Sequence, residues 1–419
     1  MAFKQVRLGD YFKFEKGLGY KGEFLAEESD VALIGMDSHK DGGGYKDDSE
    51  KPYSGPYKPE HIASTGDVIF AATEQGFGLL ASPLMVPESE KFQTFIFSHH
   101  VLKAFPTREG FLPEYLYNMF RVERIRSRAA YGDSGTTVRA LPAEVLEEQV
   151  VPLPDLQTQQ AINDIIAMID QQIANNIALS KSLETLAQAI FKSWFIDFDP
   201  VHAKKKGEKP YGMDPATASL FPSSFEESDI GEIPKGWNVT FLKEVCDIKQ
   251  GRYLSPKQMS MLPTKVDFVP VIGGNGVLGY TSKSTFEFSV PLVTCRGSKC
   301  GLLQWATYPS WVSNNAMAVT FKHNSLDNGF LQILFHNLKF DEVITGSAQP
   351  QITISHLGLL EFVMPPVKII DAFTEKYSIM RSQMDACSNT NKHLEVLLEN
   401  VLPRLIYSEV KVPNEMIAS

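Results

Sequence analysis

The chain has 419 residues, which is too long for one ordinary hydrophobic core and predicts two or three domains. Hydrophobic residues make up 43% and charged residues 21%, as in soluble globular proteins, and no apolar run approaches the ~18 residues of a membrane span. The formal net charge of −10 counts against a uniformly basic nucleic-acid binder, but affinity follows local charge, and residues 243–299 hold eight basic and four acidic side chains.

The N-terminal segment MAFKQVRLGD lacks the apolar stretch of a secretion signal. The four cysteines form no CxxC pair and have no histidine at metal-ligand spacing. We therefore expect reduced thiols in a cytoplasmic protein, with no metal site. The cysteines are Cys246, Cys295, Cys300 and Cys387.

The first globular unit contains short β-rich runs that are separated by Gly, Pro and Asn turns and followed by a short helix. We predict strands over 68–72 and 94–97 and a helix over 113–128. The segment 121–139 has five arginines against two acidic residues, so it is either a solvated helix face or part of a basic surface.

A long helix is predicted over residues 161–195, after the Pro-rich strand end at 150–154. Residues 199–235 are rich in Pro, Ser, Gly and charged residues, which favours a linker. A second long helix over 372–406 aligns with the first without a gap, at a constant offset of 211 residues.

Both long helices carry apolar residues at the 3-4 spacing of a heptad repeat over about four heptads, which predicts a coiled-coil seam. The centre of each seam is small or polar, which costs stability but fixes register. A single amphipathic helix packed on a globular core is the alternative. The seam positions are Ile166, Ile169, Ile173, Asn176, Ser180, Leu183, Ala187, Ile190 and Trp194 in the first helix, and Tyr377, Met380, Met384, Cys387, Asn391, Leu394, Leu398, Val401 and Leu405 in the second.

The repeat extends into the globular units, because the second unit also has β-rich runs, at 290–294 and 317–321, and a short helix, at 328–338. We predict an α+β fold with two similar globular domains separated by an antiparallel two-helix coiled coil, as a pseudo-twofold internal repeat. The matching motifs are Val6–Gly17 with Thr240–Gly251, Val68-Ile69-Phe70 with Leu292-Val293-Thr294, Gly78-Leu79-Leu80 with Gly301-Leu302-Leu303, and Ser98-His99-His100 with Ser313-Asn314-Asn315.

The centre of the chain resembles the central conserved region of type I restriction–modification specificity subunits. The resemblance covers nearly the whole chain and departs at Leu156-Gln157-Thr158-Gln159, where the family has Leu-x-Glu-Gln, and further at Val367-Lys368-Ile369-Ile370. The motifs that carry it are Gln159-Gln160-Ala161-Ile162 before the Ile-rich heptads, Phe191-Lys192-Ser193-Trp194-Phe195-Ile196-Asp197-Phe198-Asp199-Pro200-Val201 after them, Gly236-Trp237, and Arg296-Gly297-Ser298.

This resemblance implies that each globular unit is a target-recognition domain for double-stranded DNA. It also implies that the helices form a spacer that binds two methyltransferase subunits, which restriction subunits join for ATP-driven translocation and cleavage. The chain itself would be non-catalytic and bind no cofactor, because the partner subunits use S-adenosylmethionine and ATP. The implied divisions are 1–155 and 236–366 for the recognition domains, 156–198 and 367–410 for the spacer helices, 199–235 for the linker and 411–419 for the tail.

A helix of about 35 residues at ~1.5 Å per residue spans roughly 50 Å, on the order of 15 base pairs at ~3.4 Å each. Antiparallel helices of that length would place one recognition domain at each end. We therefore expect a bipartite target of two short half-sites with an unread gap.

Base reading requires polar side chains on exposed loops, with Arg or Lys suited to guanine and Asn or Gln to adenine. Solvated loop residues and phosphate contacts are the alternatives for each candidate. The candidates are Lys46, Thr73, Gln75, His99, Thr136, Thr137 and Arg139 in the first domain, and Arg252, Arg296, Ser298, Lys299, Asn314, Gln349 and Gln351 in the second.

Enzyme motifs are not convincing in this sequence. Pro365-Pro366 lacks the flanking Asn or Asp and aromatic residue of adenine methyltransferases, and the glycines at 17–19 and 273–276 lack the spacing of nucleotide-binding loops. His99-His100 has no third metal ligand in register. Two other classes stay open: a coiled-coil scaffold that joins other proteins without reading DNA, and a self-sufficient modification enzyme.

Overall fold

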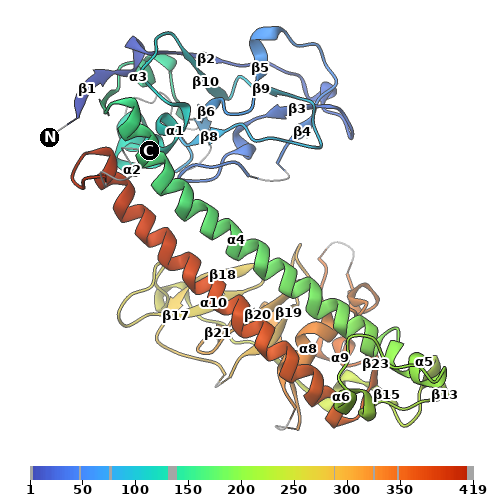
Figure 1. Ribbon diagram of the computed structural model, residues 1–419. Coiled ribbons are helices and arrows are strands. Elements are labelled where there is room, and N and C mark those ends of the chain that lie inside the picture. Colours follow the sequence, from blue (N-terminus) through green and yellow to red (C-terminus); the bar gives the residue numbers. More distant parts are fainter. Residues whose placement is uncertain are drawn as a thin grey trace. The chain divides into compact units, whose positions relative to one another are not determined.

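The computed structural model describes residues 3–46, 49–74, 78–130, 139–286, 288–323, 326–346 and 349–412 (Figure 1). The chain divides into unit 1, which comprises Met1–Asn176 and Asn389–Ser419, and unit 2, which comprises Ile177–Ser388. Two 40-residue helices, α4 (Leu156–Phe195) and α10 (Val367–Ile406), contribute to both units. Among the described residues, no helix is long and apolar enough to span a membrane.

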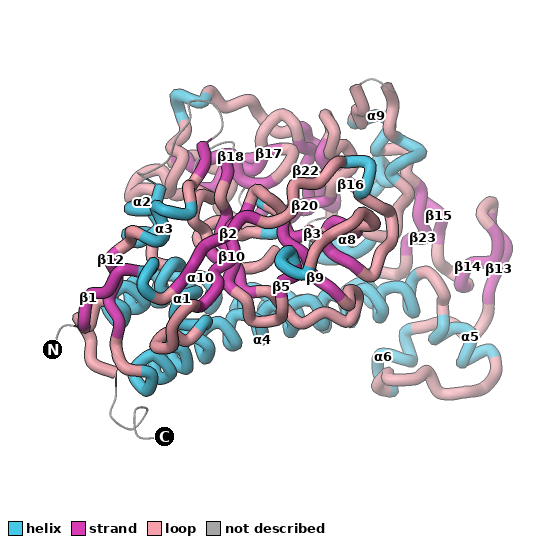
Figure 2. The backbone as a smooth tube through the Cα atoms, turned by 90° about the horizontal axis from the view of Figure 1, so that it is seen from above, coloured by secondary structure: helices cyan, strands magenta, loops and turns pink. Residues whose placement is uncertain are grey.

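The described residues of unit 1 form two four-stranded sheets, two separate strand pairs and three short α-helices. Its strands are β1 (Lys4–Arg7), β2 (Phe12–Lys16), β3 (Val31–Ile34), β4 (Lys51–Pro52), β5 (Ile62–Ala63), β6 (Val68–Ala71), β7 (Thr73–Glu74), β8 (Pro83–Met85), β9 (Thr94–Phe97), β10 (Val101–Pro106), β11 (Arg139–Ala140) and β12 (Val150–Leu153), and its short helices are α1 (Pro113–Arg121), α2 (Glu123–Ala130) and α3 (Ala143–Glu147). The central sheet is antiparallel with the order β2-β10-β6-β8, and β2 and β10 lie side by side in both views (Figures 1 and 2). The second sheet has the order β4-β3-β9-β5, and the pairs β1–β12 and β11–β7 are separate.

The core of unit 1 lies between the central sheet and α1. Proline at the first turn of α1 removes one of the N–H groups that have no partner within the helix, and the helix buries its Tyr115, Leu116, Met119 and Phe120. The ring of Phe120 lies 4.7 Å from that of Phe70 on β6 in an edge-on contact. The predicted helix over 113–128 is in fact two helices, because the backbone of residue 122 is extended.

Unit 2 repeats this arrangement. Its strands are β13 (Phe225–Ser228), β14 (Gly231–Pro234), β15 (Asn238–Phe241), β16 (Cys246–Gln250), β17 (Val269–Gly273), β18 (Gly276–Thr281), β19 (Val290–Thr294), β20 (Leu303–Ala306), β21 (Trp311–Val312), β22 (Ala316–Phe321) and β23 (Glu361–Met364), and its short helices are α5 (Asp199–Lys205), α6 (Pro215–Leu220), α7 (Leu242–Val245), α8 (Asn328–Phe335) and α9 (Ile354–Leu357). The central sheet has the order β16-β22-β19-β20, beside a three-stranded sheet β18-β17-β21 and the pairs β15–β23 and β13–β14.

The two units correspond element by element: β1–β12 to β15–β23, β2-β10-β6-β8 to β16-β22-β19-β20, and α1 and α3 to α8 and α9. The strand pairing corrects one predicted alignment. Ala71 pairs with Val101 in unit 1 and Thr294 pairs with Ala316 in unit 2, so Ala71, not Phe70, is the equivalent of Thr294. The turn after this strand is also three residues longer in unit 1, so Gly301 matches Ala81 rather than Gly78. Both residues have a positive φ, and the N–H of each donates to the equivalent carbonyl, of Thr294 and Ala71 respectively.

The long helices pack on each other within each unit. In unit 1 the first half of α4 contributes Ile162 and Ile166, and the second half of α10 contributes Leu402 and Leu405, to one core cluster. In unit 2, Phe191 at the end of α4 lies 5.5 Å from Phe373 at the start of α10 and Trp194 lies 6.2 Å from it (ring centroids), as expected for an antiparallel pair. Every predicted seam position is buried or half-buried. The predicted α+β fold of two similar domains with paired long helices is therefore confirmed.

The polar seam centre forms a direct contact within unit 1. Asn176 is 8% exposed, and its side-chain amide donates to Asn391 Oδ1 at 2.7 Å. The amide of Asn391 in turn donates to the Ile173 carbonyl at 3.3 Å. Each polar side chain thus has a partner, as burial requires.

Residues 199–235, predicted as a linker, are folded instead. They contain α5, α6 and the β13–β14 hairpin, and Val201 and Phe221 are buried in the core of unit 2. The ring of Trp237, 1% exposed, lies 6.3 Å from Phe221 and 5.6 Å from Phe198. The aromatic motif that suggested the family is thus a structural core.

Candidate nucleic-acid interface

In unit 2, four chain segments meet at one end of the central sheet. The N–H of Arg252 donates to the Val312 carbonyl at 2.9 Å, and the N–H of Cys295 donates to the Asn315 carbonyl at 2.8 Å. The Ile352 N–H donates to the Cys295 carbonyl at 3.0 Å. Strand ends and the loops after them therefore form one continuous edge, called the reading edge below.

The same four segments meet in unit 1. The Leu18 N–H donates to the Phe97 carbonyl at 2.8 Å, and the Ala72 N–H to the His100 carbonyl at 2.9 Å. The Leu141 N–H donates to the Ala72 carbonyl at 2.8 Å, as Ile352 does to Cys295. This matching pattern makes Thr73 the positional equivalent of Arg296, and Ala140 the equivalent of Gln351.

A glycine at the end of the first sheet strand makes this convergence possible in both units. A Cβ on Gly17 would lie 1.9 Å from the Phe97 carbonyl oxygen, and one on Gly251 would lie 2.1 Å from that of Ser313. Neither position therefore tolerates a side chain without a backbone shift. These two glycines are also aligned in the internal repeat of the sequence, where they end the matching motifs Val6–Gly17 and Thr240–Gly251.

The structure brings the predicted residues of the second domain together on the reading edge of unit 2. Arg296 forms a backbone bridge with Gln351, and the N–H of Gly297 donates to the Pro350 carbonyl at 3.3 Å. Gln250 donates from its amide to the Asn314 carbonyl at 2.7 Å. Six of the seven candidates are exposed and Asn314 is half-buried; the exposed ones are Arg252, Arg296, Ser298, Lys299, Gln349 and Gln351.

Sequence reasoning missed a neighbouring turn between β17 and β18. The hydroxyl of Thr294, fully buried, donates to the Gly274 carbonyl at 2.8 Å, and Gln304 donates to the Gly273 carbonyl at 2.9 Å. These bonds hold the turn, with its exposed Asn275, beside the reading edge. The sequence gives no signal for this placement, because the partners of the turn, Thr294 and Gln304, are distant from it along the chain.

The first-domain candidates are less uniform. Lys46 and His99 are exposed, whereas Thr73 is half-buried, with its hydroxyl 3.1 Å from His100 Nδ1. Arg139 pairs with Glu74 at 2.6 Å. The remaining three candidates, Gln75, Thr136 and Thr137, lie outside the described residues.

Two arginines of the basic segment 121–139 have structural roles, so neither interpretation of that segment fits them. Arg121 forms a two-pronged ion pair with Asp170 on α4, at 2.5 and 2.9 Å. Arg126 donates to the Gly42 and Phe120 carbonyls, and its burial lowers its pKa.

Burial also sets the charge of two histidines in unit 1. Desolvation lowers the pKa of His100, with a smaller contribution from the neighbouring His99. His39, whose ring Nδ1 lies 3.1 Å from the Gly35 carbonyl, is buried, and desolvation lowers its pKa to about 4. Both rings are therefore neutral at pH 7.

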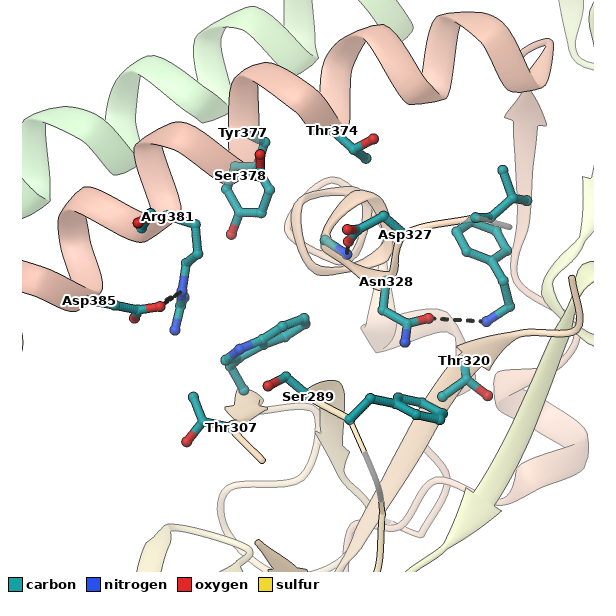
Figure 3. Close-up of a pocket in the computed structure, with 16 residues that line it drawn as sticks. Ser289, Thr307, Thr320, Asp327, Asn328, Thr374, Tyr377, Ser378, Arg381 and Asp385 are labelled. Carbon is teal, nitrogen blue, oxygen red and sulfur yellow. Dashed lines mark hydrogen bonds and ion pairs between the residues drawn. The ribbon is translucent and has the colours of Figure 1, made fainter. Parts of the chain in front are cut away.

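A hollow of about 780 Å³ in unit 2 lies between α10, the start of α8 and the sheet (Figure 3). Tyr377 and Arg381 line it from α10, and Asp327 lines it at the start of α8. Arg381 lies over the Trp305 ring at 5.5 Å and pairs with Asp385 at 3.2 Å. Asp327 accepts a hydrogen bond from the Gly329 N–H at 2.6 Å, so the two acids of the hollow are engaged with Arg381 and with the backbone at the start of α8.

Burial also decides the reactivity of a thiol in unit 2. Burial raises the pKa of the Cys246 thiol to about 12, so it is not a thiolate nucleophile at neutral pH. In the ranges that the structure describes, no three His, Cys, Asp or Glu side chains lie close enough together to hold a metal ion.

The chain is thus a duplicated protein in which the same sheet edge is built once in each unit, with exposed polar side chains gathered on the copy in unit 2. Residues 2–185 and 234–399 match the model of the type I restriction modification DNA specificity domain. The matched segments cover most of the chain, which therefore belongs to this family and recognises a DNA target.

The chain is also similar to individual members. It is 24% identical over 422 residues to the type I restriction enzyme HindI specificity subunit of Haemophilus influenzae, covering 85% of this chain and 89% of that one. It is 24% identical over 325 residues to the MjaIX specificity subunit of Methanocaldococcus jannaschii, covering 73% and 71%. The crystal structure of a type I S subunit from M. genitalium shares the fold, with a TM-score of 0.53 at 13% identity over 96% of both chains.

Proposed function

We propose that this chain is the non-catalytic specificity subunit of a cytoplasmic type I restriction–modification complex and reads a bipartite double-stranded DNA target. Each unit reads one half-site with its reading edge. The observation that carries the proposal is the convergence of the same four segments in both units, which exposes Arg296, Gln351 and Lys299 in unit 2 and His99 in unit 1. Such side chains on loops supply base and phosphate contacts in grooves of duplex DNA.

The long helices are the part of the chain common to both units. We infer that they set the length of the unread gap and carry two modification subunits, to which restriction subunits are added. The modification subunits supply S-adenosylmethionine and the restriction subunits use ATP. The chain itself contributes the sequence specificity of the complex.

Methylome sequencing of a host that carries the intact system tests the target. Two short methylated half-sites on opposite strands, separated by a gap of fixed length, are expected. Footprinting with the purified chain and its modification subunits should protect the same half-sites. A methylation pattern that does not change when this chain is deleted, or a complex without sequence preference, would refute the proposal and favour a scaffold.

The gap is tested by lengthening both helices. Seven residues inserted into α4 and seven into α10 keep the heptad register and add about 10 Å of helix. The gap should grow by about three base pairs while both half-sites stay the same. An unchanged gap would show that the helices do not measure it.

A further inference from the structure

Unit 2 carries an exposed apolar loop that begins at its reading edge. The loop, residues 253–268, lies between β16 and β17 and directly follows Arg252, which is held on the reading edge by the bond from its N–H to the Val312 carbonyl. Met261 and Leu262 in the middle of the loop are 81% and 75% exposed. Large apolar side chains that gather on a protein surface mark an interaction site. The other exposed apolar side chains of the loop are Tyr253, Val266 and Phe268.

Hydrogen bonds give this loop a defined shape. Ser260 exchanges two backbone bonds with Tyr280 on β18, at 2.8 and 2.7 Å, and its hydroxyl donates to the Leu262 carbonyl at 2.6 Å. Thr264 closes the next turn, because its hydroxyl oxygen accepts from the Asp267 N–H at 2.8 Å. The apolar side chains are therefore exposed on an anchored segment, and little further ordering of the backbone is needed when a partner covers them.

The strands that anchor the loop also lead to the reading edge. β17 lies between β18 and β21 in its sheet, and β21 ends at Val312, whose carbonyl accepts from Arg252. The turn between β17 and β18 is held beside the reading edge by Thr294 and Gln304. The loop therefore starts at the reading edge and rests on the strands that lead back to it.

The charge of the loop favours DNA as its partner. Residues 252–268 hold three basic side chains, Arg252, Lys257 and Lys265, and one acidic side chain, Asp267. All three basic side chains are exposed and can contact phosphates. The apolar side chains need an apolar surface instead. Duplex DNA offers two such surfaces, which are the thymine methyl groups and the stacked faces of the base pairs.

Unit 1 differs at the equivalent place. β3 and β9 form the same parallel pair as β17 and β21, so residues 18–30 before β3 are the counterpart of the loop. They hold four acidic side chains and one basic side chain. Phe24, near their middle, is half-buried, and its ring lies 6.1 Å from that of Tyr53. The loop of unit 1 is therefore acidic and packs this aromatic side chain inward, whereas the loop of unit 2 is basic and exposes its apolar side chains.

We propose that Met261 and Leu262 form a wedge that inserts between neighbouring base pairs in the half-site of unit 2 and bends the DNA there. This rests on the proposed function. Insertion covers both side chains and partly unstacks one base step, while Lys257 and Lys265 contact phosphates near the kink. Because the loop of unit 1 has the opposite character, the complex bends its two half-sites unequally.

The test measures the bend at each half-site separately. The chain with its modification subunits binds the duplex that methylome sequencing identifies, with two fluorescent dyes flanking one half-site, and energy transfer between the dyes reports the bend. The wild type should bend the half-site of unit 2 by about 20° or more and leave that of unit 1 straighter. The double variant Met261→Ser with Leu262→Ser should lose the bend in the half-site of unit 2.

A mismatched base pair supplies a second measurement. A mismatch at the wedge position lowers the cost of unstacking, so the wild type should bind that duplex on the order of tenfold more tightly than the matched one. The mismatch is moved through the half-site, avoiding the base that is methylated. The double variant should bind matched and mismatched duplexes alike, because it no longer unstacks the step.

Ile230→Ser is the matched control for loss of an exposed apolar side chain. Ile230 is exposed in the turn between β13 and β14, which lies at the other end of unit 2 from β17 and β18 in both views (Figures 1 and 2). This variant should keep the bend and the mismatch effect of the wild type. Gel filtration of each complex shows whether it assembles. A double variant that no longer binds the modification subunits would assign the loop to a protein interface and overturn the wedge.

The outcome for the DNA separates this inference from the proposed function. A wild-type complex that leaves the half-site of unit 2 straight, or a double variant that keeps the bend, would overturn the inference alone. If the half-site is straight and the double variant weakens binding to a thymine duplex but not to its uracil counterpart, the side chains contact thymine methyl groups. Absence of any base preference in the wild type would instead overturn the proposed function.

Discussion

Replacing Arg296 by alanine is the most direct test of the reading edge in unit 2. The side chain is exposed, while the bridge to Gln351 uses only backbone atoms, so the fold does not depend on the guanidinium. We expect the free energy of unfolding to change by less than about 0.5 kcal/mol. A lost two-pronged contact with guanine costs about 1–3 kcal/mol of discrimination, or ~5- to 150-fold in the ratio of specific to random binding.

The measurement is a fluorescence anisotropy titration of cognate and random duplexes at one fixed salt concentration, with the modification subunits present. Lys299→Ala is the matched control, because Lys299 is exposed in the same turn and carries the same charge. If Lys299 contacts a phosphate, the Lys299→Ala variant should bind both duplexes more weakly by the same factor, and its affinity should depend less on salt concentration. If Arg296→Ala also weakens both duplexes equally, Arg296 contacts phosphate and does not read a base.

Three further predictions concern stability. Asn391→Leu leaves the buried amide of Asn176 without its partner and should cost about 1–3 kcal/mol, whereas leucine at both positions should restore most of the loss in denaturant titrations. Gly251→Ala places a Cβ 2.1 Å from the Ser313 carbonyl oxygen and should cost about 1–3 kcal/mol; an unchanged Tm would contradict the close approach. Because burial lowers the pKa of His39 from 6.5 to about 4, the unfolded chain takes up the proton first as the pH falls, so stability present at pH 7 is lost below pH 6.5, by about 2 kcal/mol at pH 5. His39→Phe should remove that part of the pH dependence, which unfolding at pH 7 and pH 5 would reveal.

The internal repeat could be predicted because it depends on periodic and local sequence patterns. Heptad spacing places Ile166 and Leu398 in the seam wherever the helices meet, and Gly251 ends its strand as Gly17 does. Arg252, Arg296 and Asn314 converge because each follows a strand end or precedes a strand, and such positions meet at one edge of an antiparallel sheet. Gln351 joins them through its backbone bridge to Arg296, which no local pattern indicates.

The predictions that were wrong or missing have a common physical cause. They concern residues whose structure depends on contacts with distant parts of the chain. The composition of residues 199–235 favours a linker, yet their few apolar side chains, such as Phe221, are buried against Trp237. Arg126 resembles a surface residue until the carbonyls that it binds are known. Glu74 gives no local signal either, because Arg139, which neutralises it, lies 65 positions along the chain.

The division of the long helices has a consequence for synthesis of the protein. Unit 1 needs Asn389–Ile406 to cover Ile162 and Ile166, and all 212 residues of unit 2 come between. At ~5–20 residues per second, a ribosome takes on the order of 10 to 40 seconds to make them. During this time the apolar face of the N-terminal half of α4 has no partner helix in the nascent chain. Synthesis of unit 2 therefore ends before synthesis of unit 1, although it begins later.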